Sequence, residues 1–359
     1  MPETIAQWAE RLRGANRITG RFDLHIGDVR VRVASNSDEL LDKLRHYFRH
    51  FRGPEGGEVD FVVEAYQADK PDFGVEYVDW VRDPGKTGRK DAYADAPDGR
   101  FVWKVRTGMQ FLVGDGIHIA VGDCLANDNQ VINFVNSQYI AGLVDAGWQL
   151  CHAAAVVHGG HAVAIAGFSG RGKSTLALHL LGHGLNYASN DRLLIAKQDG
   201  GVRLSGVAKF PRINPGTALS NPHLSNILTA ERRAELEKMP VEQLWDLEEK
   251  YDVDIDAAFD DAEFILAAPM SAFVVLNWDR KTDAPLEFRR VNLREREDLL
   301  GVIVKAPGPF YIAPDGLDPD GRQIIDPEPY YDVLADIPIY EVRGRVDFDA
   351  AVDACMKLF

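Results

Sequence analysis

The chain has little that would support a disulfide framework, a membrane span or a nucleic-acid surface. It contains only three cysteines, Cys124, Cys151 and Cys355, with no CxxC or Cys/His ligand spacing, so we expect a reducing, cytoplasmic setting. No apolar run approaches the roughly 18 residues of a membrane helix, and the N-terminus MPETIAQWAERLRGANR has no secretory apolar block. The net charge of −15 argues against nucleic acid, because phosphate backbones are bound by basic surfaces.

What is present indicates a globular protein of more than one part. Its 359 residues are 46% hydrophobic and 26% charged, and this length suits a large domain with a smaller one. Residues 22–34 alternate as a hairpin around Gly27-Asp28. The stretch SNSDELLDKLRHYFRHF predicts an amphipathic helix with a capping box at Asn36 and Glu39. Its apolar face would be Leu40, Leu41, Leu44, Phe48 and Phe51.

Further short strands are expected before residue 122, at 59–65, 76–81, 101–107, 110–113 and 117–121. We therefore expect a sheet-rich α+β module over residues 1–125. The pattern of 127–150 is helical and predicts a joint over 126–150. From residue 151 to 359 strands and helices alternate, with a buried strand at 271–279 and mostly helical, acidic sequence at 228–264, which predicts an α/β domain.

The centre of the chain carries the most specific motif, VAIAGFSGRGKSTLALHLL over residues 163–181. The stretch Gly167-Phe168-Ser169-Gly170-Arg171-Gly172-Lys173-Ser174, followed by Thr175, satisfies the P-loop pattern G-x-x-x-x-G-K-[ST] between an apparent strand and helix. The glycines allow backbone N–H groups to face phosphate oxygens, and the helix N-terminus adds partial positive charge.

This motif predicts binding of ATP or another nucleoside triphosphate. Lys173 would bridge the terminal phosphates and Ser174 would bind Mg²⁺. Arg171 lies within the loop, and we expect its side chain to point outward. The other interpretation is a glycine turn with an incidental lysine. An LSGGQ-like sequence, an NKxD motif and an arginine-rich lid are all missing, which argues against ABC-type ATPases, GTPases and nucleoside monophosphate kinases.

Four stretches around the loop resemble the catalytic domain of HPr kinase/phosphorylase, a family similar in fold to phosphoenolpyruvate carboxykinase. His152 lies fifteen residues before Gly167. GFSGRGKST resembles the family's GDSGxGKSE, HGLNYASNDRLLI resembles its GHRLVADDRV, and FVVLNWD resembles its LENWD strand. The resemblance covers about residues 150–280, and CHAAAV, SNDR and KFPRINPG are most similar to the branch called HPr-kinase-related kinase B.

The resemblance implies a P-loop kinase domain and roles for four further residues. Asp191 would be the general base or a Mg²⁺ ligand, unless it is a turn aspartate. Asn190, where the family has a second carboxylate, would orient the same water or metal ion, unless it makes a local turn hydrogen bond. His152 would position Asp191 or contact phosphate, unless it is a buried core histidine. Arg212 in KFPRINPG would stabilise the transferred phosphoryl group, unless it pairs with an acid. Lys209 of the same stretch is a further candidate cation.

The sequence therefore predicts an ATP- and Mg²⁺-dependent phosphotransferase that moves the γ-phosphoryl group to a hydroxyl of a protein serine or a small metabolite. The alternative is a nucleotide-dependent ATPase switch that controls a protein partner. The HPr kinase family forms rings, so the resemblance also implies a homo-oligomer. The missing second carboxylate and the missing family stretch IRGLGIIN argue against the reverse phosphorylase reaction and against recognition of HPr itself.

Overall fold

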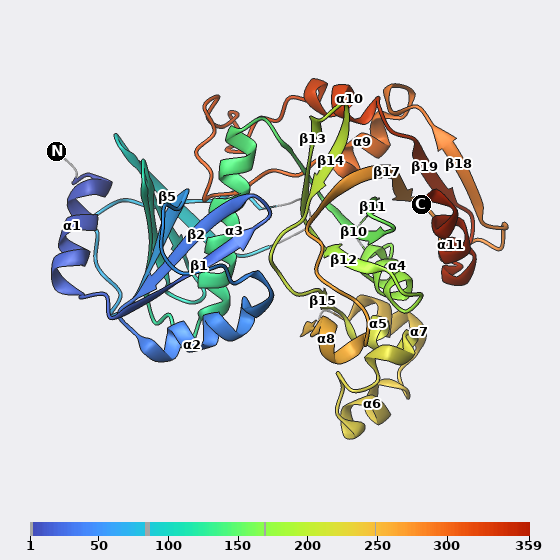
Figure 1. Cartoon of the computed structure of the whole chain (residues 1–359), viewed down its shortest axis with the longest axis horizontal. Coiled ribbons are helices and arrows are strands. Elements are labelled where there is room, and N and C mark those ends of the chain that lie inside the picture. The colour runs from blue at the N-terminus through green and yellow to red at the C-terminus, as the bar shows by residue number, and fades with distance from the viewer. Residues whose placement is uncertain (1–2, 83–86, 169, 248) are drawn as a thin grey trace. The chain divides into compact units, whose positions relative to one another are not determined.

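The computed structural model describes residues 3–82, 87–168, 170–247 and 249–359. The chain divides into two compact units, one made of Met1–Ala146 with Ala306–Ile325 and the other of Gly147–Lys305 with Asp326–Phe359. Both contain a large sheet with helices, so the fold is mixed α/β (Figure 1). Among the described residues, no helix combines the length and the apolar character needed to cross a membrane.

The strands of the first unit form one mixed sheet in the order β1-β2-β3-β8-β7-β6-β5-β4. Their bounds are β1 Gly20–Ile26, β2 Val29–Ser35, β3 Phe61–Gln67, β4 Val78–Asp79, β5 Asp91–Ala96, β6 Gly99–Lys104, β7 Gln110–Gly114 and β8 Ile117–Gly122. The predicted hairpin is confirmed, because β1 and β2 pair antiparallel from Gly20↔Ser35 to Ile26↔Val29. Strand β5 was not predicted, since DAYADA lacks the bulky alternation of a strand.

Helices cover both faces of this sheet. Helix α1 Ile5–Ala15 shares a core with Leu112, whereas Phe111, the next residue of β7, packs against Phe134 of α3 Asp128–Asp145 at 4.9 Å between ring centroids. Successive strand side chains point to opposite faces, so α1 and α3 lie on opposite sides of the sheet.

Helix α2 Asp38–Tyr47 is followed by the short helix η1 Arg49–Phe51. The apolar face expected for this stretch is buried. The cap lies one residue later than predicted, because the Ser37 hydroxyl, not Asn36, accepts the Leu40 N–H. The Asn36 side chain instead bonds the backbone of Gln67 in β3.

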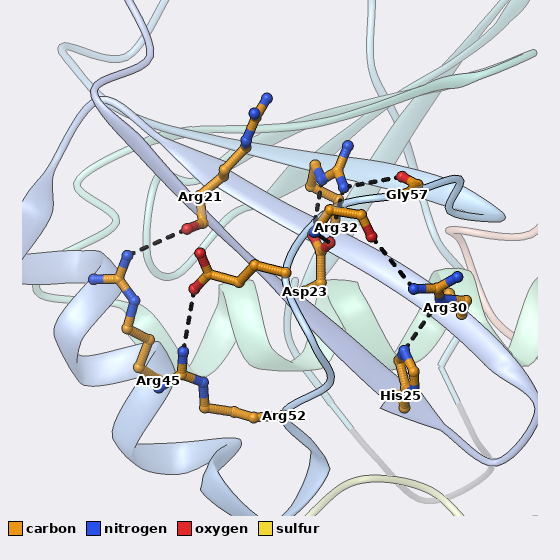
Figure 2. A network of polar contacts seen from close by, with 10 residues as sticks. Arg21, Asp23, His25, Arg30, Arg32, Arg45, Arg52 and Gly57 are labelled. Atoms are coloured by element: carbon orange, nitrogen blue, oxygen red, sulfur yellow. Dashed lines mark hydrogen bonds and ion pairs between the residues drawn. The ribbon is translucent and has the colours of Figure 1, made fainter.

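Hydrogen bonds from three arginines connect the first hairpin internally and to its surroundings (Figure 2). Arg32 makes two hydrogen bonds to Asp23, of 2.7 and 2.8 Å, and Asp23 is buried. Arg30 donates to the imidazole of His25 at 3.1 Å. Figure 2 also shows Arg45 donating to the backbone of Arg21. Arg30 and Arg32 therefore link β2 to β1, and Arg45 links α2 to β1.

Two of the domain boundaries expected from the sequence differ from the boundaries of the two compact units. Helix α3 ends at Asp145 and belongs to the first unit, while residues 149–150, expected to continue it, belong to strand β9 Gln149–Cys151. Residues 306–325, expected in the second domain, return to the first unit. There the ring of Phe310 packs 4.9 Å from Phe111, and Arg100 donates to the carbonyl of Tyr311.

The second unit contains a sheet in the order β12-β10-β11-β17-β14-β13-β9, with β19 on β17 and β18 on β19. The bounds are β10 Ala153–His158, β11 His161–Gly167, β12 Asn186–Ser189, β13 Leu193–Gln198, β14 Gly201–Ser205, β17 Ala267–Leu276, β18 Glu287–Val291 and β19 Ile339–Arg343. A separate pair joins β15 Arg212–Ile213 to β16 Tyr251–Asp252.

The helices of this unit are α4 Lys173–Leu181, α5 Pro215–Ser220, α6 Ala230–Leu236, α7 Val241–Asp246, α8 Ile255–Ala258, α9 Glu297–Ile303, α10 Glu328–Leu334 and α11 Phe348–Cys355. Short helices also lie at η2 Pro222–Leu224, η3 Leu293–Glu295 and η4 Met356–Leu358. The segment 228–264 was expected to be mostly helical, but its described residues form only the short helices α6, α7 and α8 together with β16. Figure 1 shows these helices gathered with α5 at one end of the unit.

Strand direction places several chain segments at one edge of the sheet. Strands β11 and β12 both pair antiparallel with β10, so they run parallel to each other, and β17 and β19 run parallel to β11. The carboxyl ends of these four strands are Gly167, Ser189, Leu276 and Arg343. The carboxyl edge of such strands is where α/β proteins bind ligands.

Candidate functional site

The glycine loop, residues 167–174, connects β11 to α4 at this edge. Gly167 ends β11, Gly172 caps α4 with φ of 87°, and Gly170 has φ of 71°. These positive φ values require glycine. The strand, loop and helix that the motif needs are therefore present, with Lys173 and Ser174 in the first helical turn. Ser169 lies outside the described residues.

Close packing explains the glycines at both ends of the loop. A Cβ on Gly167 would lie 2.9 Å from the Cβ of Leu276 in β17, and one on Gly172 would lie 2.8 Å from the ring of Phe348 in α11. The ring of Phe348 is in turn stacked on His179 at 5.5 Å. The loop is thus held between β17 and α11.

Arg171 is where the structure corrects the sequence prediction. Its guanidinium does not point outward: it donates to the carbonyl of Trp278 and lies 3.7 Å from a carboxylate oxygen of Asp279. The indole N–H of Trp278 donates back to the carbonyl of Arg171 at 2.7 Å. Arg280 donates to the carbonyl of Gly170 at 2.5 Å. The segment after β17 therefore fixes the loop through reciprocal hydrogen bonds.

Lys173 is directed at its own loop, with Nζ donating to the carbonyl of Gly167 at 3.0 Å. Burial lowers the pKa of Lys173; Asp191 opposes this effect, while Lys305 and Lys250 add to it. An anion bound near Lys173 would stabilise its charged form and so oppose the effect of burial. Thr175 is buried, and its hydroxyl lies 2.8 Å from that of Thr217, so Thr175 anchors the helix inside the protein.

His152 and Asp191 come together at the same edge. The Nε2 atom of His152 lies 3.2 Å from a carboxylate oxygen of Asp191. Surrounding protein atoms raise the pKa of Asp191, but the hydrogen bond from His152 and the charges of Arg192 and Lys173 outweigh them and hold it well below its usual range. Water still reaches 63% of the Asp191 side chain and screens these charges. Asp191 is therefore an ionised, accessible carboxylate.

Asn190 and Arg212 lie beside this pair. The Asn190 amide donates to the carbonyl of Arg212 at 3.5 Å, while its Oδ1 is buried and has no hydrogen-bond partner among the described residues. The guanidinium of Arg212 pairs with Asp252 at 2.9 Å and is 41% exposed. Arg212 thus follows the interpretation in which it pairs with an acid, although this pair is open to solvent.

The sequence analysis missed several cations of this region, namely Arg192, Lys250, Arg280 and Lys305. Each acts electrostatically on Lys173 or Asp191 or bonds the glycine loop. Arg192 follows Asp191 within the stretch SNDR, but Lys250, Arg280 and Lys305 lie 77 to 132 positions from Lys173, and no local motif marks them. Only the tertiary structure could identify these three.

No protein-family model matches this chain, and no curated protein sequence matches it either. Among solved structures, the chain is similar to the HPr(Ser) kinase/phosphatase from Coxiella burnetii at 14% identity. That alignment covers 58% of this chain and 92% of the other, with a TM-score of 0.29. The relationship is a distant structural one.

Proposed function

We propose that this chain is an ATP- and Mg²⁺-dependent phosphotransferase that moves the γ-phosphoryl group of ATP to a hydroxyl acceptor. One observation carries the proposal. The glycine loop with Lys173 and the His152–Asp191 pair lie at the same carboxyl edge of one sheet, so a loop suited to phosphate and an ionised carboxylate occur at one edge.

The loop would hold the nucleotide through its main-chain N–H groups and the N-terminus of α4. The ammonium of Lys173, which now donates to the carbonyl of Gly167, would turn to the phosphates. A hydrogen bond to a charged phosphate oxygen would then replace the hydrogen bond to an uncharged carbonyl. The Arg171–Trp278 hydrogen bonds would keep the loop in place before the nucleotide arrives. Such preorganisation lowers the ordering cost of binding.

The donor set beside the loop suits Mg²⁺, which prefers oxygen ligands. Ser174 and Asp191 offer a hydroxyl and a carboxylate, and Asn190 offers the buried amide oxygen that has no hydrogen-bond partner within the described part of the chain. These three residues would hold the ion. When bound, Mg²⁺ supplies charge neutralisation of the phosphate oxygens.

In the transfer step, the acceptor oxygen forms a bond to the γ-phosphorus while the bond from that phosphorus to the β–γ bridging oxygen breaks, and ADP leaves. Asp191 takes the acceptor's proton, and His152 holds the carboxylate in position. Arg212 would stabilise the charge on the transferred group. Its exposed pair with Asp252 is worth under about 1 kcal/mol, so exchanging that partner costs little.

The experiment is a titration with a fluorescent ATP analogue, comparing wild type with Lys173→Met. A hydrogen bond to a charged group contributes about 1.5–3 kcal/mol, so affinity should fall about 10- to 100-fold. The matched control is Lys197→Met, because Lys197 in β13 is exposed and pairs only with Asp332 and Asp336 among the contacts described. Unchanged affinity in Lys173→Met would refute the phosphate-binding role of the loop.

A nucleotide-dependent switch is the second candidate function. It is favoured by the hydrogen bonds between the glycine loop and the segment that follows β17. Occupying the loop would be transmitted to Trp278 and Arg280, which bond it directly. The two functions differ in turnover. A switch hydrolyses ATP slowly without any acceptor, whereas a phosphotransferase leaves a labelled product when incubated with γ-labelled ATP and a lysate or metabolite panel.

A further inference from the structure

Trp278 lies two residues after the end of β17, beside the glycine loop. Its side chain is fully buried, and its ring packs 5.1 Å from the ring of Phe348. On either side of it, Asn277 and Asp279 donate their backbone N–H groups to carbonyls of residues 342–344, at 2.9 and 2.8 Å. Both the ring and the main chain of Trp278 are therefore held in place.

The indole N–H of Trp278 fixes one peptide group of the glycine loop. It donates to the carbonyl of Arg171 at 2.7 Å, although 107 positions separate the two residues. There is no cis peptide bond among the described residues, and in a trans peptide the carbonyl and the following N–H point in opposite directions. The N–H of Gly172 is therefore directed away from the indole.

The N–H of Gly172 has no acceptor within the described part of the chain, which distinguishes it from the N–H before it. In the preceding peptide group, the carbonyl of Gly170 accepts from Arg280 at 2.5 Å. The N–H of the same peptide group, that of Arg171, donates to the carbonyl of Phe168 at 3.1 Å. That peptide group is thus bonded at both ends, whereas the next one is bonded only through its carbonyl.

Without an external partner, the peptide group before Gly172 would rotate easily. Gly170 and Gly172 have no Cβ and occupy positive φ, at 71° and 87°, where glycine has wide conformational freedom. Half a turn of this peptide group would exchange the N–H for a carbonyl oxygen, which repels a phosphate. The indole hydrogen bond opposes that rotation, and the guanidinium of Arg171 donates to the carbonyl of Trp278 in return.

We propose that Trp278 is a positioning residue of the phosphate site: its indole N–H holds the peptide group between Arg171 and Gly172 so that the Gly172 N–H faces a phosphate oxygen. The inference rests on the proposed nucleotide binding by the glycine loop. Gly172 caps α4 and Lys173 follows it, so the anion would meet this N–H together with the helix N-terminus and the lysine. Trp278 acts only through Gly172, so its effect is on phosphate groups and not on the base.

The first test replaces Trp278 site-specifically by benzothienylalanine, whose ring has a sulfur atom where the indole has its N–H. Calorimetry on the full-length chain would measure a non-hydrolysable ATP analogue with Mg²⁺ and, separately, inorganic tripolyphosphate. Both affinities should fall about tenfold, because one hydrogen bond to a charged oxygen is lost. The matched control is the same replacement at Trp103, whose indole N–H has no hydrogen-bond partner among the described residues; it should change neither affinity.

Rescue by a closely related side chain separates the N–H from the packing of the ring. Replacing Trp278 by 5-fluorotryptophan keeps the N–H donor and should preserve the wild-type affinity for both ligands. An equal loss with 5-fluorotryptophan and with benzothienylalanine would overturn the inference, because ring packing alone would then explain the result.

The amide resonance of Gly172 gives a direct measurement of its orientation. In the wild type, saturation with tripolyphosphate should move the Gly172 amide proton downfield, as expected when an N–H donates to a charged oxygen. With benzothienylalanine at position 278, this shift should be much smaller at saturation. An equal shift in both proteins contradicts the inference.

The outcomes also separate this inference from the proposed function. If the wild type binds the ATP analogue and the chain with benzothienylalanine at Trp278 binds it equally well, the proposed function stands and the inference fails. If the wild type binds neither the analogue nor tripolyphosphate, the proposed function fails and the inference fails with it.

Discussion

The packing of Gly172 against α11 leads to a prediction that separates backbone strain from steric overlap. Gly170→Ala and Gly172→Ala both place a side chain at positive φ, 71° and 87°. This strain costs about 1–2 kcal/mol in each variant. A Cβ on Gly170 meets nothing within 4 Å, whereas one on Gly172 would lie 2.8 Å from Phe348. Overpacking adds about 1–3 kcal/mol, so Gly172→Ala should lose about 2–5 kcal/mol in all.

The ring of Phe348 cannot move away freely, because it is stacked on His179 and lies 5.1 Å from the ring of Trp278. The free energy of unfolding would be measured by urea denaturation with two probes, which checks that the transition is two-state. Phe348→Leu removes the overlapping ring atom, so a double-mutant cycle with Gly172→Ala should recover the overpacking part. Equal losses in Gly170→Ala and Gly172→Ala, or no coupling to Phe348→Leu, would refute this explanation of the loop.

Two further predictions concern buried groups. Glu341→Gln should destabilise the protein by about 3 kcal/mol in urea unfolding, because fully buried Glu341 accepts hydrogen bonds of 2.6 and 2.9 Å from Arg296, and the neutral amide would leave this cation with the more exposed Asp298 as its remaining carboxylate. The exposed Glu328→Gln should cost under about 1 kcal/mol, and equal losses would contradict the argument. Burial raises the pKa of the thiols of Cys124, Cys151 and Cys355. At pH 8, iodoacetamide should therefore label them about 10³-fold more slowly than free cysteine until denaturant is added. Fast labelling of one thiol in the native protein would be inconsistent with its burial.

Elements with a strong local signal could be predicted from the sequence. The hairpin of β1 and β2 has alternating residues around a two-residue turn, and α2 has apolar residues at helical spacing. The strand, loop and helix around Gly167 are also defined locally, because positive φ at Gly170 and Gly172 depends on residue type. In each case the information lies within about twenty residues.

Elements that depend on distant partners could not be predicted in the same way. Strand β5 has small and acidic residues and owes its conformation to pairing with β4 and β6. The return of residues 306–325 to the first unit depends on Phe310 meeting Phe111, which lies 199 positions earlier, from 310 to 111. The side chain of Arg171 was misjudged for the same reason, since its partner Trp278 follows a different strand.

The catalytic half of the proposed site shows how strand order decides what a sequence motif can do. Because β10 lies between β11 and β12, the ends of the latter strands are separated by two strand spacings, about 10 Å. Gly167 and Asp191 are therefore not adjacent through the backbone. His152, which immediately precedes β10, is placed between them and contacts Asp191. An antiparallel strand inserted between two parallel ones thus gives His152 a position that neither the glycine motif nor the spacing to Asp191 specifies.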